Sequence, residues 1–518
     1  MQPLARRDPD QRLGDLRAAF GVIDDLRHHF LRSVFIVRMY IIRLYSKGVD
    51  VGSDEAKTRG RALLALSCAA QFMVVLDVSV VNVALPSIQS ALGFNAADLP
   101  WVVNAYAVVF AGFLLLGGRL ADVWGRRRTF LGGLALFTAA SLAGGVAGTA
   151  GLLTAARAVQ GLGAAVLAPA TLTVLMAAFP EGARRTRALA VWTAVGIAGG
   201  TAGNLLGGAL TEFLTWRSTL LINVPVGALA LVAAVKLLPA DTGRASRPRL
   251  DVPGAVAVTV GLGALSYGVS RFADGGGHGL AIAAVGIGIT ALTAFVLIEW
   301  RAAGTPLIPL RLFTSRAILV GNAVMLLTGA CLNPMWYFLA LSMQNVLHYS
   351  AVQTGLGFLP HTLLSIAVGT WLTPWLMRFV RHQLLIVGGA LLAAAGFGWQ
   401  SALTPGSGYL VGIAGPAILI ALGSGLLNTP LTTTVTAGID PADAGAASGL
   451  MNTTKQAGAA LGLAVLVAAT GTTATTPEQL AAAYGHAFLL IAAILTAAAA
   501  VAFAIPGRAR QLASTGSS

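Results

Sequence analysis

The chain has 518 residues, of which 56% are hydrophobic and only 10% are charged. This composition excludes an ordinary soluble domain and indicates a polytopic membrane protein. The net charge of +14 would favour nucleic acid as a partner of a soluble protein, but here the basic residues gather in alternate predicted loops, and we expect no nucleic-acid partner. Apolar runs of about 20 residues, together with 62 glycines, predict closely packed helices and not a barrel.

Residues 1–61 form a basic extension before the first long apolar run. Its segment FLRSVFIVRMYIIRLYSK, Phe30 to Lys47, places basic residues among aliphatic and aromatic ones. This pattern is typical of an amphipathic helix on an anionic membrane surface. A poorly ordered tail, or a natural start at Met39, is the alternative interpretation.

The rest of the chain contains fourteen apolar runs in the order six, two, six. The runs begin near Leu63, Val102, Phe130, Leu153, Ala188 and Leu220, and continue at 253–270, 279–298, 318–341, 352–377, 384–402, 409–432, 449–470 and 483–504. They predict an all-α fold of 14 transmembrane helices. We expect a six-helix bundle at 62–238, a linker with two additional helices at 239–316, a second six-helix bundle at 317–505 and a short tail at 506–518.

The charges of the loops predict the orientation. One set of alternate loops carries basic clusters such as Arg126–Arg128 and Arg244–Arg249, whereas the other set contributes only Arg217 and Arg271. By the positive-inside rule, the basic loops and both termini are expected in the cytoplasm, and the protein in the cytoplasmic membrane.

Several classes of chemistry find no support in the sequence. Cys68 and Cys331 lie in separate apolar runs, which favours neither a disulfide nor a metal site. No phosphate-binding loop, zinc-binding helix or nucleophile elbow occurs. We therefore expect neither an enzyme nor a protein with a metal or another cofactor.

The loop GGRLADVWGRRRTF follows the second run. Its glycines permit a tight turn and close helix packing, and Asp122 with the arginines could form a charge-paired latch at the cytoplasmic surface. A plain basic loop would explain the arginines but not the spacing of Gly118, Asp122, Gly125 and Arg126. This loop resembles the signature loop of the major facilitator superfamily.

Four further segments narrow the resemblance. LDVSVVNVALP, with Ser79 where threonine is usual, LTAARAVQGLGAA, WRSTLLINVPVG and SGLMNTTKQAGAALG are similar to motifs of the fourteen-span drug:proton antiporters. The resemblance covers about residues 62–505. It implies two helical bundles that rock about a central substrate site, and the export of hydrophobic compounds driven by protons.

The fifth run departs from that family. It reads GIAGGTAGNLLGG, with Asn204 where the family's antiporter motif has proline. Gly199, Gly203 and Gly207 still form a small-residue face, and Gly208 follows. The proline kink is lost, which leaves a plain packing face as the alternative to a role in antiport.

Asp77 lies within the apolar run that contains MVVLDVSVVNVALP. A carboxylate in this setting is costly and usually functional. Counted from the ends of their runs, Asp77 and Arg157 lie at similar depth, in the outer half of the first bundle. Hydrocarbon disfavours the charged carboxylate and a guanidinium favours it, so that the pair could take up and release a proton. A static salt bridge is the alternative.

Uncharged polar and aromatic residues in other runs could line a cavity between the two bundles, where such transporters bind substrate. They are Asn82, Asn104, Gln160, Asn333, Trp336, Tyr337 and Asn428. Each alone could equally form an interhelical hydrogen bond or an interface anchor. A mostly apolar cavity suits bulky lipophilic molecules, neutral or cationic.

These observations predict a proton-coupled exporter of hydrophobic drugs or natural products. Its expected partners are a lipophilic small molecule, protons and membrane lipids, and we expect a monomer. A proton-coupled or facilitative importer of a small metabolite is the alternative within transport. A membrane sensor with the same fold is the alternative outside it, although a sensor has no need of Asp77 and Arg157.

Overall fold

The computed structural model describes residues 54–241, 250–273, 278–301, 310–437, 439, 443–471 and 474–505. The segment 30–47, predicted to be amphipathic, and the predicted tail 506–518 lie outside the described residues. Within the described ranges all regular structure is helical. The described residues from Gly60 onward form one compact unit, to which the following description applies.

The helices follow one another with short connections. Their bounds are α2 Asp54–Leu92, α3 Trp101–Trp124, α4 Arg126–Gly145, α5 Ala150–Ala178, α6 Ala183–Phe213, α7 Ser218–Leu221, α8 Asn223–Leu237, α9 Val252–Ala273, α10 His278–Arg301, η1 Leu310–Thr314, α11 Arg316–Leu332, α12 Met335–Leu341, η2 Ser342–Val346, α13 Ala351–Gly357, α14 Leu359–Ala367, η3 Val368–Leu372, α15 Thr373–Leu376, α16 His382–Gln400, η4 Leu410–Ala414, α17 Gly415–Thr436, α18 Ala444–Thr470 and α19 Pro477–Ala502. The segments η2, η3 and η4 are single turns of π-helix within longer helical runs.

Every predicted run corresponds to a helix or to consecutive helical pieces. Twelve of these, among the described residues, are long and apolar enough to cross a membrane. The other two are α4, which begins with three arginines, and α18; α4 packs against α5 and α8, and α18 against α11 and α3. The chain is thus an all-α, multi-pass membrane protein with at least twelve candidate spans, and fourteen spans remain a prediction.

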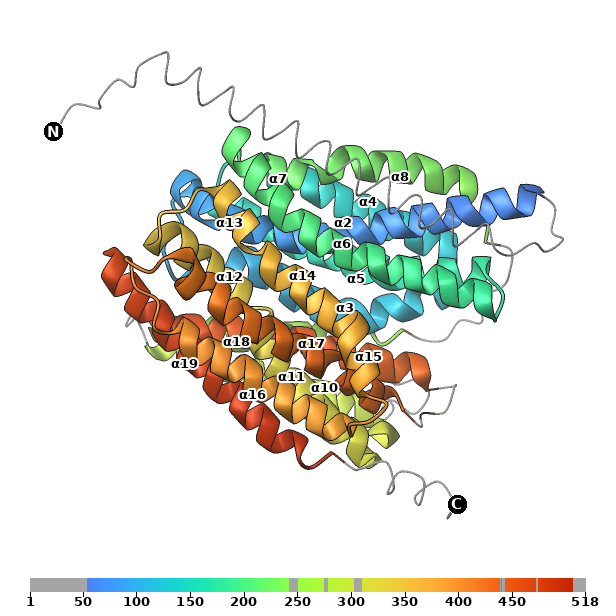
Figure 1. Cartoon of the computed structure of the whole chain (residues 1–518). Coiled ribbons are helices and arrows are strands. Elements are labelled where there is room, and N and C mark those ends of the chain that lie inside the picture. The colour runs from blue at the N-terminus through green and yellow to red at the C-terminus, as the bar shows by residue number, and fades with distance from the viewer. Residues whose placement is uncertain are drawn as a thin grey trace. The chain divides into compact units, whose positions relative to one another are not determined.

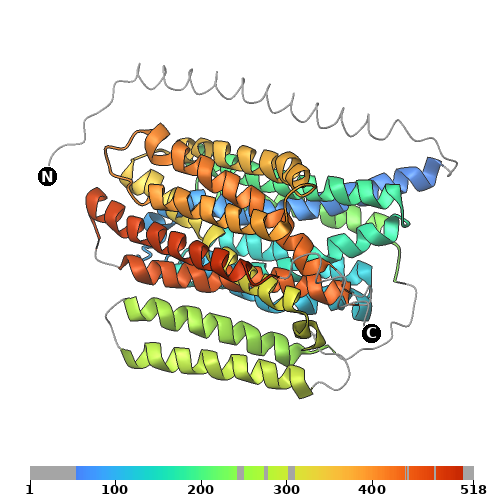
Figure 2. The same cartoon turned by 60° about the horizontal axis from the view of Figure 1, so that its bottom comes forward.

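Two sets of helices make up the unit. Figure 1 shows α2 to α8, in blue to green, beside α11 to α19, in yellow to red. The additional pair, α9 and α10, packs together along one side of the unit, as Figure 2 shows in light green. Of the two, α9 contacts α3 from the first set and α18 from the second, so it bridges them.

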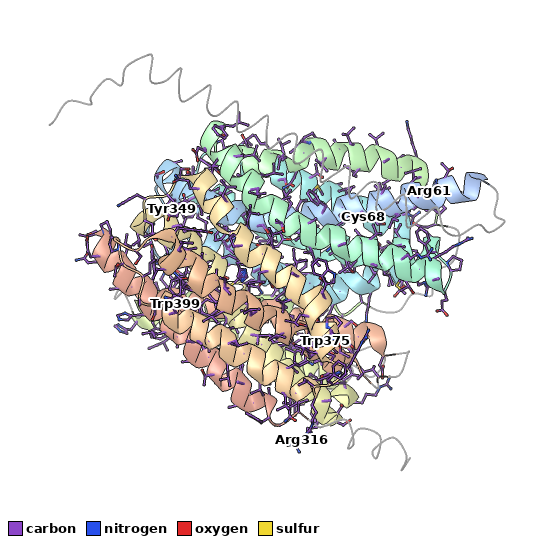
Figure 3. All side chains as sticks on the ribbon, viewed as in Figure 1. Arg61, Cys68, Arg316, Tyr349, Trp375 and Trp399 are labelled. Carbon is purple, nitrogen blue, oxygen red and sulfur yellow. The ribbon has the colours of Figure 1, made fainter. Side chains whose placement is uncertain are left out.

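The two ends of the bundle differ. We call the end that carries the turn between α3 and α4, with Arg126–Arg128, the basic end, and the other the opposite end. In Figure 3, Arg61 and Trp375 lie toward the basic end and Tyr349 toward the opposite end. Exposed tryptophans occur near both ends, Trp375 and Trp399 among them, as expected at membrane–water interfaces.

Candidate functional site

Asp77 lies in the interior of α2 with no exposed surface. Its Oδ2 accepts a hydrogen bond of 2.6 Å from Nη1 of Arg157 on α5, whose side chain is 2% exposed. Sequence depth alone placed the two at similar heights, and the structure brings them into direct contact. A buried charge pair of this kind is tolerable only if the remaining polar atoms also find partners.

The other carboxylate oxygen is held by two amides. Gln160 Nε2 donates to Asp77 Oδ1 at 2.7 Å, and Asn223 Nδ2 donates to the same oxygen at 2.8 Å. Gln160 also contacts Ser141 Oγ on α4 at 2.7 Å. The carboxylate therefore joins α2 to α5 and α8, and through Gln160 to α4.

Arg157 completes the network toward α3. Its Nε donates to the Val102 carbonyl at 3.0 Å, and its Nη1 donates to Gln160 Oε1 at 2.6 Å. Its guanidinium carbon lies 4.6 Å from the centre of the Tyr106 ring, a cation–π contact. Asp77, Arg157 and their partners are called the Asp77 network below; it contains one acid and one base and connects five helices.

This arrangement has a clear chemical consequence. A carboxylate accepts several hydrogen bonds when it is ionised and fewer when it is protonated. Protonation of Asp77 would also leave the Arg157 charge without its counter-ion. Gain or loss of one proton would therefore change contacts between α2, α5 and α8 at once.

The turn between α3 and α4 is held by a different acid from the one that the sequence predicted. Asp122 is exposed and has no hydrogen-bond or ion-pair partner within the described part of the chain. The carboxylate that holds the loop is Asp241, which accepts from the backbone N–H groups of Arg127 and Arg128 at 3.1 and 3.2 Å. The expected latch through Asp122 is therefore not formed, and Asp241 caps the first turn of α4 instead.

The glycines of this turn explain how Asp241 reaches the backbone amides of α4. Gly125 has φ +91°, a conformation that favours glycine and reverses the chain between α3 and α4. A Cβ on Gly125 would collide with the Asp241 carboxylate. Gly118 faces Pro169 on α5, and Arg126 is exposed. The spacing noted in the sequence thus creates the turn that presents the α4 amides to Asp241.

The small-residue face of α6 packs closely on α2. A Cβ on Gly199 would lie 2.9 Å from the Phe72 carbonyl oxygen, on Gly203 2.7 Å from that of Leu76 and on Gly207 2.7 Å from that of Val80. Because Leu76 precedes Asp77, α6 supports the backbone that carries the carboxylate. The helix continues unbroken from Ala183 to Phe213, as expected without an internal proline.

The other face of α6 contacts the second set of helices. The Asn204 carbonyl oxygen lies 2.5 Å from the position of a Cβ on Gly355, and Gly208 packs against Ala351 and Val352. Asn204 itself is buried. Asn204 and Gly208 thus belong to the contact between the two sets of helices, whereas Gly199, Gly203 and Gly207 face α2.

Two polar links join the sets near the opposite end. Glu212, near the end of α6, accepts from the backbone N–H of Val352 at 2.7 Å. Gln344, in the π-helical turn η2, donates to the Val83 carbonyl of α2 at 2.9 Å. These links hold the two sets of helices together at that end.

The structure separates the residues predicted to line a cavity. Gln160 belongs to the Asp77 network, while Asn82 and Asn428 donate to carbonyls one turn earlier in their own helices. Asn104 Oδ1 and Asn333 Nδ2 are buried without a hydrogen-bond partner in the described part of the chain.

The aromatic candidates pack against other rings. Trp336 makes edge contacts with Phe358 and His361, each with ring centres 5.0 Å apart. Tyr337 is buried against Phe338. Among the predicted cavity residues in the described ranges, Asn104 and Asn333 are thus the two that have a fully buried polar atom without a hydrogen-bond partner.

A pocket of about 590 Å³ opens between α3, α5 and α9 near the opposite end. Its lining is largely apolar and consists of Phe94, Asp98, Trp101, Ala105, Val108, Val109, Ala150, Gly151, Thr154, Ala155, Ala158 and Tyr267. None of the residues selected from the sequence lines it. It lies against the far side of the α3–α5 pair that holds Arg157.

Comparison with known proteins identifies the family to which this chain belongs. Residues 67–463 match the Major Facilitator Superfamily, which is more than half of the chain. The chain belongs to this superfamily. It is 55% identical to the cephamycin export protein CmcT of Amycolatopsis lactamdurans over 89% of this chain and 95% of that one. It is 43% identical to the puromycin resistance protein pur8 of Streptomyces alboniger, over 79% and 82%.

Solved structures support the superfamily fold. A structure from work on proton-dependent oligopeptide transporters aligns with a TM-score of 0.62 at 16% identity, covering 86% of this chain and 98% of that one. At this identity the likeness concerns the fold alone. The chain is a superfamily transporter and not an enzyme.

The sequence did not predict four residues that form key hydrogen bonds in the structure of this superfamily member. Asn223 was available as an isolated amide within WRSTLLINVPVG, and Ser141 as a hydroxyl in an apolar run. Asp241 and Glu212 gave no signal, because each is a single acid at a helix end whose partners are backbone amides.

Proposed function

We propose that this protein exports lipophilic small molecules, antibiotics among them, across the cytoplasmic membrane in exchange for protons. The relatives named for cephamycin export and puromycin resistance support the direction and the substrate class. The observation that carries the coupling to protons is Asp77, a fully buried carboxylate with three hydrogen-bond donors, one of them charged. Ionisable residues inside spans mark proton and substrate pathways.

In this proposal Asp77 binds the transported proton and Arg157 is its counter-ion. Protonation weakens the hydrogen bonds from Arg157, Gln160 and Asn223, which releases α2 from α5 and α8. Because α6 rests on α2 through Gly199, Gly203 and Gly207, the change reaches the contact between the two sets of helices. The links made by Glu212 and Gln344 then open, and the site alternates between the two sides.

The remaining assignments follow from the same proposal. The basic end faces the cytoplasm, both termini lie there, and the protein acts as a monomer with membrane lipids around it. The substrate binds between the sets of helices, where Asn104 and Asn333 offer unmet polar atoms. Gly118, Gly125 and Arg126 shape the cytoplasmic turn, and Asp241 takes the part first expected of Asp122.

Everted membrane vesicles test the proposal. With an imposed acidic interior, the exporter accumulates dyes and antibiotics inside, and dissipation of the gradient by a protonophore releases them. Vesicles that contain Asp77→Asn serve as the coupling control. Accumulation only in right-side-out vesicles would identify an importer, and no movement of any compound in either orientation would favour a sensor.

A further inference from the structure

A lysine lies in the middle of α18 and takes no part in the Asp77 network. Lys455 stands 11 residues after the first residue of the helix, Ala444, and 15 before the last, Thr470. At a rise of 1.5 Å per residue, it is therefore roughly 16 Å and 22 Å from the two ends. An ammonium group at this depth is as costly as the carboxylate of Asp77 and calls for a partner.

The second set of helices offers no carboxylate to Lys455. From Arg316 to Val346, at 351–376, at 382–400 and at 410–436 the sequence contains neither aspartate nor glutamate, and in α19 only Glu478 occurs, in the first turn. Within the described residues the ammonium makes no hydrogen bond or ion pair. Lys455 is thus unlike Arg157, whose charge is matched inside the protein.

Lys455 belongs to a polar face of α18. Ser448, Asn452 and Gln456 follow one another at four-residue spacing, and Lys455 lies beside them on the helical projection. Asn452 is exposed, and the other three are partly buried. Exposed amides and an ammonium are not tolerated against lipid, so this face is expected to border water and not lipid.

The neighbours of α18 locate this face. On one side, Gly458 packs against Leu326 and Ala330 of α11, from the second set of helices. On another side, Ala460 packs in one apolar cluster with Val108 and Ala111 of α3, from the first set. At 100° per residue Asn452 and Gln456 lie between these two sides, at the junction of the two sets, and Lys455 lies at the edge of this face next to α11, whose Gly329 packs against the Lys455 backbone.

We propose that Lys455 binds a negatively charged substituent, such as a carboxylate, on an otherwise lipophilic substrate. This inference rests on the proposed export function and specifies its substrate class. The ligand's anion supplies the counter-charge that the helices lack, through charge-assisted hydrogen bonds from an ammonium with three donors. As a flexible point charge, lysine accepts anions of differing geometry, unlike the planar fork of arginine. The site thereby favours anionic over neutral or cationic lipophilic molecules.

Three fluorescent probes test this in proteoliposomes with an imposed proton gradient: N-dansyl-L-phenylalanine, its neutral amide N-dansyl-L-phenylalaninamide, and the cation rhodamine 6G. The wild type should take up the carboxylate with a lower KM than the amide. Lys455→Gln should raise the KM for the carboxylate about tenfold or more, as expected for loss of a charged hydrogen bond, and change that for the amide less than about twofold. Lys455→Arg should retain most of the carboxylate uptake. Lys236→Gln, at the exposed end of α8, is the matched lysine control.

The outcomes separate the inference from the function on which it rests. Uptake of the amide or rhodamine 6G in preference to the carboxylate, or an equal loss of both dansyl probes in Lys455→Gln, overturns the role of Lys455 while leaving export intact. Failure of the wild type to move any of the three removes the proposed function as well. If Lys455→Gln does not reach the membrane, thermal unfolding of the wild type decides: the carboxylate should raise Tm more than the amide, and equal shifts would refute the inference.

Discussion

Asn223 of α8 donates its side-chain amide to Asp77 of α2 across 146 positions of sequence, at 2.8 Å. Both side chains are almost completely buried. Through this hydrogen bond, α8 contacts directly the carboxylate that we propose binds the proton.

Replacement of Asn223 by leucine should change the pH dependence of transport. The leucine has a similar size but no donor, and loss of a donor to the ionised carboxylate favours the protonated form. Half-maximal gradient-driven uptake is therefore expected at a higher pH than in the wild type. Asn82→Leu is the control, because Asn82 donates only within its own helix. An unshifted pH profile in Asn223→Leu would separate this bond from proton binding.

Variants of the Asp77–Arg157 pair should separate the effect on protein stability from the effect on proton coupling. Asp77→Asn removes the negative charge beside Arg157 and leaves a buried charge unpaired, which should lower the free energy of unfolding by about 3–5 kcal/mol. In the double variant Asp77→Asn/Arg157→Gln no charge is stranded, so most of that stability should return. Gradient-driven uptake should be lost in both. Thermal unfolding in detergent beside uptake in proteoliposomes measures the two effects, and uptake by the stable double variant would exclude Asp77 as the proton carrier.

The packing of α6 on α2 should tolerate no side chain at Gly203. Alanine there would place Cβ 2.7 Å from the Leu76 carbonyl oxygen, and the overpacking should cost about 1–3 kcal/mol. Gly200 is the matched control, because its added Cβ would meet only Ser79 and Val75 at 3.7 Å. Thermal unfolding of the two variants, each compared with the wild type, makes the test. Equal melting temperatures for Gly203→Ala and Gly200→Ala would show that α6 can shift away from α2.

The turn between α3 and α4 should depend on Asp241 more than on Asp122. Asp241→Asn weakens the cap on the Arg127 and Arg128 amides, at a cost of about 1 kcal/mol, and should slow transport. Asp122→Asn should leave stability unchanged. Initial rates of uptake and thermal unfolding are measured for both variants. A slower rate in Asp122→Asn alone would assign Asp122 a contact made only in the other state of the transport cycle.

Reporter fusions test the proposed orientation. Fusions at 271–278 and 403–408 should report outside the cell, and fusions at 240–250 and 436–446 inside it, because the proposed orientation puts the basic loops in the cytoplasm. A reporter that works on one side only, such as alkaline phosphatase, distinguishes the two. An external signal from 240–250 would reverse the orientation.

The sequence predicted what depends on composition and on local pattern. Apolar runs gave the helices, and an acid and a base within such runs identified Asp77 and Arg157 before their contact was seen. Glycines at four-residue spacing in α6 predicted a packing face, and the face is present against α2.

The sequence did not predict contacts whose partners, such as backbone N–H groups, leave no recognisable pattern in it. Asp122 looked like the latch because it stands beside the arginines, yet Asp241, more than 110 positions from them, reaches their amides. Backbone N–H groups occur at every residue, so nothing in the sequence marks the ones that an acid will cap. Lys455 lies in the family-like segment SGLMNTTKQAGAALG, but its significance depends on the absence of acids from the middle of the neighbouring helices, which no local pattern shows.

The hydrogen bond between Glu212 and Val352 joins a side chain to a main-chain group, so substitutions at the two positions have different effects on it. The donor is a main-chain amide, which every residue type except proline supplies at position 352. Side chains along α13 can therefore be substituted without loss of this hydrogen bond. The acceptor is one side chain, and its replacement by a shorter or uncharged residue would weaken the hydrogen bond in a single step. This contact between the two sets of helices thus depends on the identity of residue 212 and hardly at all on that of residue 352.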